Sequence, residues 1–574
     1  MGKKYMMLVL MGWICLIFTG MSAAADPPTA QRAGGIAGRE EQRRQQEDLQ
    51  RRITAERIQD QAADVQEEDM ENAGPEVMIR TIRVEDYTLL TEDEVRSVTA
   101  EYEGQKLTLK DMQKIADLLT ARYREKGFVT SRAYLPPQDL QSGVLVIRVV
   151  EGRLGEVDIR GNEHFRTDQL REQIGLKSQG YFDYSALQKS LVYINEHPDR
   201  TARAVLVPGG KPGTTDVVLE VDDRLPFHAG VSYDNWGSRF IDEDRYALIL
   251  EHNNLTGHDD KMYFKGQLAE NQQLTLGLLR YVYPVDMELE IGAYALYSKV
   301  RSGDEFAALD AEGEAAIYGL FLTQNLYETE NAEVRANAGF DYKSIEDTML
   351  GAQLSRDELR VVKGGLDFDI SDRWGRSILV TEVDRGIPDI LGGMAAEDPH
   401  SSRGGAGSGA EFTKGIVNLF RLQPMPWETA LLWKNYGQFS NDTLVASEEF
   451  QIGGPTSVRG YPPAEFSGDK GWYTALELSI PVYPIPRDAG APFSKDRLYD
   501  ALRLVLFWDW AYAQRNRPDA GEKEKHTLQG AGFGLRYNVT EDLDFRLEIG
   551  YPLSGPTPSD GDHMHPWVEF SYKW

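Results

Sequence analysis

The last roughly 350 residues of the chain consist largely of short segments in which apolar and polar residues alternate. Leu543–Tyr551 is the clearest of them, with apolar residues at the odd positions and mostly polar ones at the even positions. Met287–Ala293 and Leu274–Leu278 alternate in the same way. A period of two is typical of a strand with two different faces. Each segment is therefore expected to turn its apolar side to lipid and its other side to water.

A soluble β-sandwich would also alternate, so the ends of the segments matter. Tyr and Trp residues gather near the expected strand ends, as they do at the two interfaces of a membrane barrel. The terminal segment Val568–Trp574 also alternates, with apolar residues at every second position through the last one. These features favour a transmembrane β-barrel from Arg224 to Trp574.

The chain from about residue 77 to 223 has a different pattern, in which strand and helix periods follow one another. A first unit is predicted in the order β-α-α-β-β: Val77–Val84, Glu92–Glu101, Thr108–Glu125, Phe128–Leu135 and Val144–Val150. The same order returns about 75 residues later, with Leu154–Ile159, Thr167–Ile174, Tyr184–Asn195, Ala202–Pro208 and Thr215–Val221. Two small α/β modules in series are expected, at 77–152 and 153–223.

The N-terminus reads as a signal peptide over residues 1–25. Lys3 and Lys4 precede an apolar stretch from Met6 to Gly20, and Ala23-Ala24-Ala25 forms a small-residue cleavage site. The mature chain is thus expected to begin at Asp26, outside the cytoplasm. Cys15, the only cysteine, lies in the removed part. Disulfides, thiolate metal sites and cysteine nucleophiles are thereby excluded from the mature chain.

Residues 26–76 are expected to hold a polar helix and a linker. From about Ala37 to Met70 the composition is mainly Arg, Gln and Glu, and only Leu49, Ile53, Ile58 and Val65 could anchor a helix. Such a thin apolar stripe does not suit an ordinary core. One interpretation is a solvated charged linker; the other is a helix that plugs a wet cavity.

Charge and hydropathy narrow the function classes further. Loss of Lys3 and Lys4 moves the formal net charge from −29 to −31, which repels nucleic acid. After the predicted signal peptide no run of 18 apolar residues occurs, so no transmembrane helix is predicted. The mean hydropathy of −0.45 remains compatible with a barrel, because only alternate residues of its strands face lipid.

One glycine-flanked segment, Gly453–Tyr461, stands out, and it contains Val458, Arg459, Gly460 and Tyr461. In Leu502–Trp510 the even, apolar positions are expected to face lipid, which turns Phe507 and Asp509 into the lumen. Leu476, Leu478 and Ile480 turn Glu477 inward in the same way. Two inward carboxylates on neighbouring strands need a cation, and a guanidinium can bind either one in a bidentate manner.

Taken together, these motifs resemble the TpsB transporters of two-partner secretion, which export haemolysins and adhesins. The modules resemble POTRA domains. In the first module, Leu135–Gln138 and the C-terminal segment Val150-Glu151-Gly152 are similar to the corresponding segments of the family. Val458-Arg459-Gly460-Tyr461 resembles the motif of the sixth extracellular loop, whose Arg meets an Asp of the inner wall in the family. Phe507–Ala511 resembles the wall motif aromatic-x-Asp-x-Gly, except that Ala511 stands in place of the Gly.

The resemblance implies a mostly β protein: a 16-stranded antiparallel transmembrane barrel preceded by two POTRA domains and an N-terminal plug helix. It implies an outer-membrane translocator of a Gram-negative bacterium, with its POTRA domains in the periplasm. The expected partners are a secreted TpsA-like exoprotein with an N-terminal secretion domain, outer-membrane lipid and lipopolysaccharide, and the barrel-assembly machinery. No cofactor, metal or nucleic acid is expected.

Two rival functions are weaker. A barrel-assembly insertase of the same superfamily shares the Val-Arg-Gly loop but typically carries more POTRA modules. An outer-membrane enzyme would need a catalytic constellation, and none is found. His563 and His565 lie beside Asp560 and Asp562 in a Gly-, Pro- and Ser-rich segment that is expected to be a flexible solvated loop. Gly404–Gly409 is likewise expected to be a loop.

Overall fold

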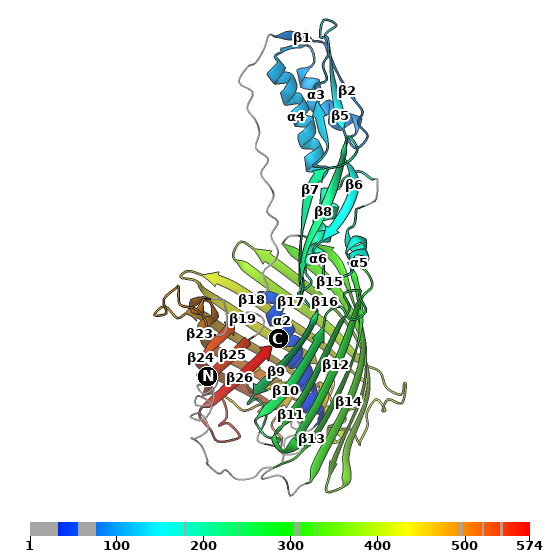
Figure 1. Cartoon of the computed structure of the whole chain (residues 1–574). Coiled ribbons are helices and arrows are strands. Elements are labelled where there is room, and N and C mark those ends of the chain that lie inside the picture. The colour runs from blue at the N-terminus through cyan, green and yellow to red at the C-terminus, as the bar shows by residue number, and fades with distance from the viewer. Residues whose placement is uncertain are drawn as a thin grey trace.

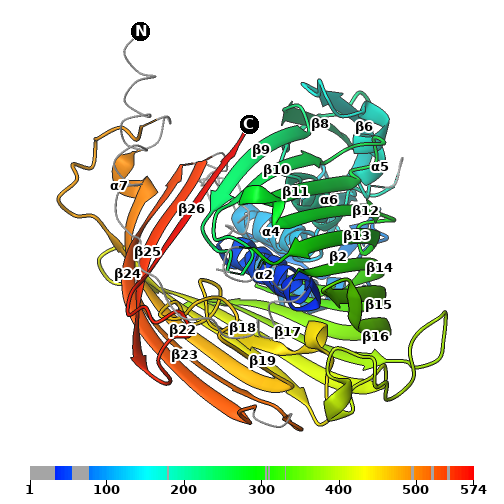
Figure 2. The same cartoon turned by 90° about the horizontal axis from the view of Figure 1, so that it is seen from below.

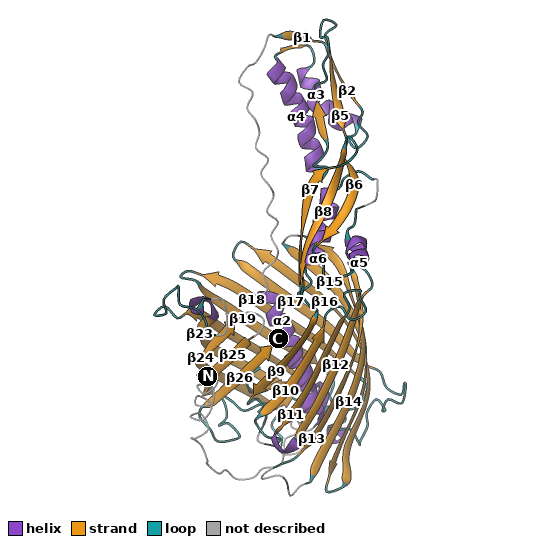
Figure 3. Ribbon diagram, viewed as in Figure 1, coloured by secondary structure: helices purple, strands orange, loops and turns teal. Residues whose placement is uncertain are grey.

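The computed structural model describes residues 33–54 and 76–574, except 177–179, 239, 304–306, 308–309, 330, 493–496, 519–521 and 540–542. The predicted signal peptide and residues 55–75, including Ile58 and Val65, lie outside the described residues. A column of two α/β modules stands on one end of a barrel (Figure 1). Helices occur in the modules, inside the barrel and in short connections, and the barrel wall is made of strands joined by loops (Figure 3).

The first module has the predicted order with two additions, a 3-10 helix and a short strand between the two predicted helices. Its elements are β1 (Val77–Ile79), β2 (Thr81–Glu85), α3 (Glu92–Thr99), η2 (Ala100–Tyr102), β3 (Gln105–Leu107), α4 (Leu109–Glu125), β4 (Arg132–Tyr134) and β5 (Val144–Val150). The predicted first strand is split at Arg80, where the partner changes from β3 to β5. Capping boxes at Thr91 and Thr108 start α3 and α4, since each Thr side chain accepts from the residue three positions on.

The second module repeats this arrangement. It contains β6 (Arg153–Arg160), α5 (Thr167–Gln173), α6 (Tyr184–Asn195), β7 (Arg200–Pro208) and β8 (Thr214–Asp223). Its sheet has the order β6-β8-β7, and that of the first module has the order β2-β5-β4. In each sheet the strand that comes last in the chain, β5 or β8, lies in the centre. It runs parallel to β2 or β6 and antiparallel to β4 or β7. Each module encloses its own apolar core.

Sixteen strands form a closed antiparallel barrel, as the resemblance implied. They are β9 (Phe227–Asp234), β10 (Arg245–His252), β11 (Lys261–Ala269), β12 (Leu274–Pro284), β13 (Leu289–Arg301), β14 (Ala311–Glu328), β15 (Ala332–Met349), β16 (Ala352–Asp372), β17 (Gly375–Gly386), β18 (Phe412–Met425), β19 (Thr429–Ser440), β22 (Lys470–Pro481), β23 (Leu502–Gln514), β24 (Lys525–Val539), β25 (Leu543–Ser554) and β26 (His565–Lys573). Closure of β26 on β9 leaves no free edge in the ring.

The direction of the strands gives the barrel two distinct ends. Since β9 follows β8 directly, the end where β9 begins is the one next to the modules, called here the module end. An even number of strands returns β26 to the same end. The opposite end, called the far end, carries the longer connections, including 387–411 and 441–469. The helices η3 (Glu270–Gln272) and η5 (Gly404–Ala406) lie in far-end connections, and α7 (Leu498–Ala501) lies in a module-end one.

The predicted facing of the strands is mostly correct. Leu506 and Leu476 are exposed on the outer surface, whereas Asp509 and Glu477 beside them are buried in the lumen. Ile291 is exposed on the outside as well. None of the helices within the described ranges is both long and apolar enough to cross a membrane.

The prediction for Leu274–Leu278 is wrong. Leu274, Leu276 and Leu278 face the lumen, where they are buried in a cluster with Ile36 and other apolar side chains. Leu279, on the opposite face of β12, is exposed. The leucines can point inward because apolar side chains of a helix and of the β9–β10 connection, rather than water, cover this part of the wall. Alternation therefore located the strand, but polarity alone could not tell its inside from its outside.

That helix is α2 (Ala33–Thr54), which runs inside the ring of strands (Figure 2). It begins four residues before the expected Ala37, and the rest of the expected stretch, 55–70, lies outside the described residues. Leu49 and Ile53, two of its predicted anchors, are buried. Of the two interpretations of this segment, the described part agrees with a helix in a cavity rather than with a solvated linker.

A single carboxylate holds several parts of the first module together. Glu151 accepts hydrogen bonds from the backbone N–H groups of Thr88 and Leu89, at 2.6 and 2.7 Å, and from the Tyr123 hydroxyl at 2.9 Å. Burial alone would raise the pKa of Glu151, but hydrogen bonds from Thr88 and Leu89 outweigh burial and hold the pKa below its usual value. The carboxylate thus connects the segment before α3, helix α4 and the module's exit.

We expect Glu151→Gln to destabilise the first module by about 1–3 kcal/mol, because an amide cannot accept all these hydrogen bonds. In the wild type the stabilisation is complete above the unfolded pKa of about 4.3 and is lost as the pH falls through the lower folded value. Hydrogen exchange of the full chain in detergent measures both effects. Glu76→Gln, at an exposed residue, is the control. Equal exchange rates in the two variants would contradict the assignment.

Candidate functional site in the barrel lumen

The connection between β19 and β22, residues 441–469, folds into the barrel from the far end. It contains η6 (Ala446–Glu448), β20 (Phe450–Ile452) and β21 (Phe466–Gly468), and β20 pairs with β21. Most of its side chains are buried. The predicted motif Val458–Tyr461 lies in this inward-folded loop, between its two short strands.

Arg459 contacts three carboxylates of the inner wall. Its Nε and Nη2 donate to the two oxygens of Asp509 on β23, at 2.8 and 2.6 Å, and its backbone N–H donates to the same side chain at 3.1 Å. Its Nη1 lies 2.9 Å from Glu477 on β22 and 3.0 Å from Glu548 on β25. The exposed fractions are 2% for Arg459 and 0% for Asp509. The structure thus brings Arg459, Asp509 and Glu477 together at bonding distance.

Two further cations complete this cluster. Arg536 of β24 bonds to Glu477 at 2.9 Å and to Glu548, and Lys434 of β19 bonds to Glu477 at 2.9 Å. Three cations therefore face three carboxylates, and each charge has a partner. A buried charge is tolerated when it is paired and hydrogen-bonded in this way. Asp509 is the carboxylate that depends on Arg459 alone among these three cations.

The glycine of the motif permits the close approach of loop and wall. A Cβ built on Gly460 would lie 2.5–2.6 Å from backbone atoms of Tyr551 and Pro552. A Cβ on Gly550, also in the wall, would lie 2.1 Å from the carbonyl oxygen of Arg459. Both distances are shorter than contacts between real atoms, so any side chain at either position would push the loop away from β25.

The remaining motif residues surround Arg459. The guanidinium lies 3.5 Å from the centre of the Phe507 ring, which provides a cation–π contact. The Tyr461 hydroxyl donates to the carbonyl of Ser554 at 3.0 Å. Val458 packs in an apolar cluster that also contains Ala511. The extra methyl of Ala511, relative to the Gly of the related pattern, is accommodated there and does not keep the loop from Asp509.

Glu548, Arg536 and Trp567 also belong to the site, but sequence reasoning did not single them out. The Trp567 indole N–H donates to the carbonyl of Arg459 at 2.8 Å. The alternation in Leu543–Tyr551 already predicts that Glu548, at an even position, faces the lumen, so the sequence could have indicated this residue. Nothing in the sequence connected Arg536 or Trp567 to residues about 80 to 110 positions earlier.

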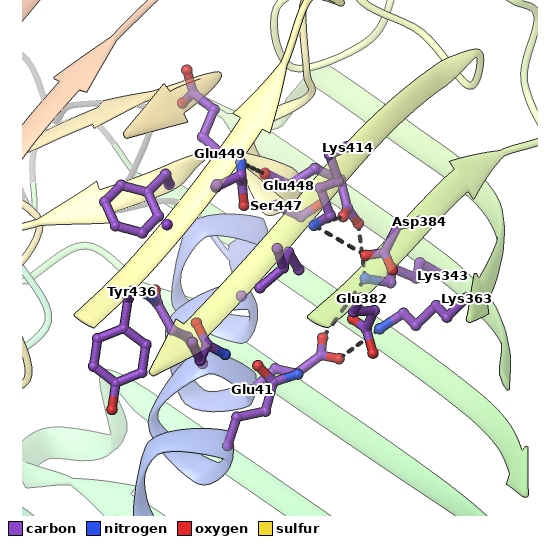
Figure 4. A pocket seen from close by; sticks show the side chains of 18 residues that line it. Glu41, Lys343, Lys363, Glu382, Asp384, Lys414, Tyr436, Ser447, Glu448 and Glu449 are labelled. Carbon is purple, nitrogen blue, oxygen red and sulfur yellow. Dashed lines mark hydrogen bonds and ion pairs between the residues drawn. The ribbon is translucent and has the colours of Figure 1, made fainter. Parts of the chain in front are cut away.

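A second group of charges lies where α2, the loop and the wall meet (Figure 4). Lys343 of β15 bonds to Glu448 of the loop at 2.8 Å and lies 3.7 Å from Glu41 of α2. Lys363 of β16 bonds to Glu41 at 2.9 Å, and Lys414 of β18 bonds to Glu448 at 2.6 Å. Wall lysines therefore bind acids of both segments that fill the lumen.

The predicted flexible loop around His563 and His565 is partly wrong. His565 starts β26 and is buried, its Nε2 lies 2.9 Å from Asp560, and its ring stacks on Trp567 at 5.9 Å between ring centres. It thus supports the indole that contacts Arg459. Among the described residues, the carboxylates of Asp242, Asp244 and Glu270 lie within 4.8 Å of one another, but no other feature there points to a bound ion.

A closed barrel with two α/β modules at one end, and with a helix and a loop filling its lumen, defines a transporter of the outer membrane. Comparison with known families gives the same class. Residues 213–537 match the family described as haemolysin secretion/activation protein ShlB/FhaC/HecB, and residues 77–152 match the ShlB-type POTRA domain. The chain belongs to this family, whose members are outer-membrane translocators of exoproteins and not enzymes.

Individual relatives agree with this assignment. The heme/hemopexin transporter protein HuxB of Haemophilus influenzae (strain 86-028NP) is 23% identical, over 82% of each chain. The outer membrane transporter CdiB of Dickeya dadantii (strain 3937) is 24% identical, over 84% of each chain. The structure of CdiB from Escherichia coli superposes with a TM-score of 0.72 at 21% identity, and covers 96% of this chain and 100% of its own. The module end of the barrel therefore faces the periplasm and the far end faces the exterior.

We expect Arg459→Ala to leave a folded, heat-modifiable barrel in the outer membrane while the amount of exoprotein in the medium falls sharply. The substitution strands Asp509 without a cation, which costs ~3–5 kcal/mol locally, and it frees the loop from the wall. Asp509→Asn should have the same effect. Immunoblots of medium and membrane fractions measure both quantities.

Arg487→Ala, at an exposed Arg of a periplasmic turn, is the matched control and should secrete normally. An exchange of the two charges, with Asp at 459 and Arg at 509, should not restore secretion, because the new carboxylate would face Glu477 and Glu548. Wild-type secretion by Arg459→Ala from an equal amount of barrel would show that this pair has no role in transport.

Proposed function

We propose that the protein captures an unfolded TpsA-like exoprotein through its POTRA domains in the periplasm and secretes it through the barrel after α2 leaves the lumen. The observation that carries this proposal is the chemistry of the plug: α2 is joined to the wall by several ion pairs, and few of its side chains belong to apolar clusters. A segment held in this way can be removed and replaced in a wet channel, whereas an apolar core could not be opened without a large loss of burial.

The ion pairs of α2 are spread around the wall. They are Glu40 with Lys265 of β11 at 2.6 Å, Glu41 with Lys363 of β16 at 2.9 Å, Arg43 with Asp234 of β9 and with Glu569 of β26 at 3.3 Å each, and Arg52 with Asp367 of β16 at 3.0 Å. When α2 leaves, water enters and hydrates both members of each pair. Pairs in water contribute only ~0–1 kcal/mol, so the gain in hydration offsets most of the lost attraction.

Helix and loop support one another in the closed state. Lys343 lies within ion-pair distance of Glu41 of α2 and of Glu448 of the loop. The Gln451 side chain donates to the carbonyl of Gly35 at 2.9 Å, and a Cβ on Gly38 would lie 2.7 Å from the carbonyl oxygen of Ser447. We infer that departure of α2 releases part of the loop's support, so the two segments open together while Arg459 keeps the loop's tip on the wall.

Capture is assigned to the POTRA domains because they are the soluble part on the side from which an exoprotein arrives. An extended chain can add to a sheet edge through main-chain hydrogen bonds, with little demand on its sequence. Among the described module strands, the longest edge is β7, and Val205 and Leu206 on it are exposed. This edge fits an unfolded segment with apolar residues.

The other proposed partners follow from location. The apolar outer surface of the barrel contacts outer-membrane lipid, and lipopolysaccharide at the outer leaflet. Insertion of such a barrel is assigned to the barrel-assembly machinery. The relatives carry names such as heme/hemopexin transporter and hemolysin transporter; for this chain we propose a cargo of the same broad kind, a secreted exoprotein.

The insertase alternative is less well supported. A BamA structure from Haemophilus ducreyi superposes with a TM-score of 0.51 at 15% identity, which reflects a shared barrel fold. An insertase needs no charged helix through its lumen, since its substrates assemble in the membrane. The ion pairs of α2 with the wall therefore favour a translocator.

Deletion of residues 33–54 should raise the single-channel conductance in planar bilayers, because α2 occupies the lumen. Glu40→Gln and Lys265→Gln should each increase the frequency of openings, since each removes the same ion pair. The double variant should add little to either single variant, because no pair is left to break. Unchanged conductance after the deletion would contradict the plug function.

Purified POTRA domains, residues 77–223, should bind the N-terminal region of the cognate exoprotein while that region is unfolded. Glu at position 205 or 206 should weaken binding by charging the edge of β7. Met78→Glu, at an exposed apolar residue of β1, is the matched control. Isothermal titration with unfolded and folded ligand measures the affinities. If the POTRA domains bind neither the unfolded nor the folded region, the barrel must be the part that recognises the exoprotein.

A further inference from the structure

The second POTRA domain meets the barrel through a buried polar contact, called here the joint. From the domain it includes Gln169, Gln173, His197, Asp199 and Arg200, and from the barrel Asn253, Asp259 and His228. Asn253 and Asp259 lie in the periplasmic turn between β10 and β11, and His228 lies at the start of β9. Figure 1 shows this domain standing directly on the barrel.

Asp259 of the barrel turn receives every donor in its half of the joint from the POTRA domain. The two terminal nitrogens of Arg200 donate to its two oxygens at 2.8 and 2.6 Å, and the amides of Gln169 and Gln173 donate at 2.5 and 2.6 Å. The Arg200 side chain is fully buried. Its Nε donates to the carbonyl of Ile194 at 3.0 Å, so the guanidinium is held from both sides.

The second half of the joint is reciprocal. Here the carboxylate is Asp199 of the domain, and the donors belong to the barrel side: Asn253 at 2.7 Å, His228 at 2.6 Å and Arg224 at 2.9 Å. His197 lies between the halves, because its Nε2 is 2.7 Å from the carbonyl of Asn253 and 4.0 Å from Asp259, and its Nδ1 accepts from the N–H of Asp199. Each body thus places one buried carboxylate among donors of the other.

Reciprocal, forked contacts restrict orientation more than an apolar contact would. Apolar surfaces slide over one another with little change in energy, whereas a bidentate Arg–carboxylate pair has one favourable geometry. Buried ion pairs contribute little net stability compared with apolar residues of the same volume, and their best attested use is to specify one arrangement. Asp259 is also held in the left-handed region, at φ 59°, so the turn adopts a disfavoured backbone to present it.

We propose that the Arg200–Asp259 pair and the Asp199 contacts hold the second POTRA domain in one orientation on the barrel, so that a captured chain is delivered to the periplasmic mouth of the lumen. Asp259, Arg200 and Asp199 are positioning residues, since they act on the direction of the POTRA column and not on the cargo itself. The inference rests on the proposed capture by the POTRA domains and adds that capture without orientation is insufficient.

The mature chain is expected to lack cysteine, so Lys211→Cys and Glu288→Cys place two spin labels uniquely, one on the domain and one on an exposed periplasmic turn. Pulsed spin-resonance distances on the full-length protein should be narrowly distributed in the wild type. Asp259→Ala and the nearly isosteric Asp259→Asn should broaden the distribution and lower secretion several-fold, at unchanged heat-modifiability and unchanged binding of the exoprotein's N-terminal region.

The charge exchange Arg200→Asp with Asp259→Arg should restore a narrow distribution and much of the secretion, because Gln169 and Gln173 are neutral and can present either oxygen or nitrogen. A purely structural role would instead lower the heat stability of the Asp259 variants, which orientation alone leaves unchanged. A broadened distribution with wild-type secretion, or a narrow distribution in both Asp259 variants, would overturn the proposal. Loss of exoprotein binding in Asp259→Ala would overturn it too, because capture would then be the step affected.

If the wild-type protein itself does not bind the exoprotein, capture by the POTRA domains is wrong. The distances and secretion of the Asp259 variants still decide whether the joint is needed. The two failures are therefore distinguishable.

Discussion

The guanidinium of Arg459 is a full charge that lies buried in the lumen against the inner wall, and the rest of the lumen is arranged around that constraint. Because water does not reach this charge, carboxylates must balance it, and they come from β22, β23 and β25. Those carboxylates in turn require Arg536 and Lys434. The loop can reach this depth because Gly460 and Gly550 have no side chain, so the backbones of the loop and the wall come into direct contact there. One charge thus determines residue choices on five wall strands.

Helix α2 is held by the same kind of interaction, ion pairs with the wall. In the proposed opening, water would enter the lumen as the helix moves, and hydration would replace the attraction lost on separation. The Arg459 cluster, in contrast, is packed against Phe507, and Trp567 donates to the carbonyl of Arg459. Loss of Arg459 leaves Asp509 without a cation. On this proposal the two sets of salt bridges differ in function because water reaches the α2 pairs during opening and does not reach the Arg459 cluster, although the residue types are the same.

Many elements of the fold could be predicted from residue pattern. The modules were predictable because helices such as α4 and α6 carry buried residues at helical spacing and start at capping residues. The barrel was predictable because lipid and lumen impose opposite chemistry on alternate residues. The same rule failed at Leu274–Leu278, where α2 covers the wall and the inner surface is apolar. Alternation reports a difference between two faces, and the identity of each face depends on what packs there.

The sequence by itself determined the strands, the two modules, the polar helix and the likeness of Val458–Tyr461 and Asp509 to a known pair of motifs, since each is written in a local pattern. Only the tertiary structure decided which charges meet. Glu548, Arg536 and Trp567 join Arg459, and Lys343 joins α2 to the loop, through positions far apart in the chain. The physical reason is that hydrogen bonds and ion pairs form only between groups a few ångströms apart. Closure of the barrel, together with the entry of α2 and of the 441–469 loop into its lumen, brings those residues within that range.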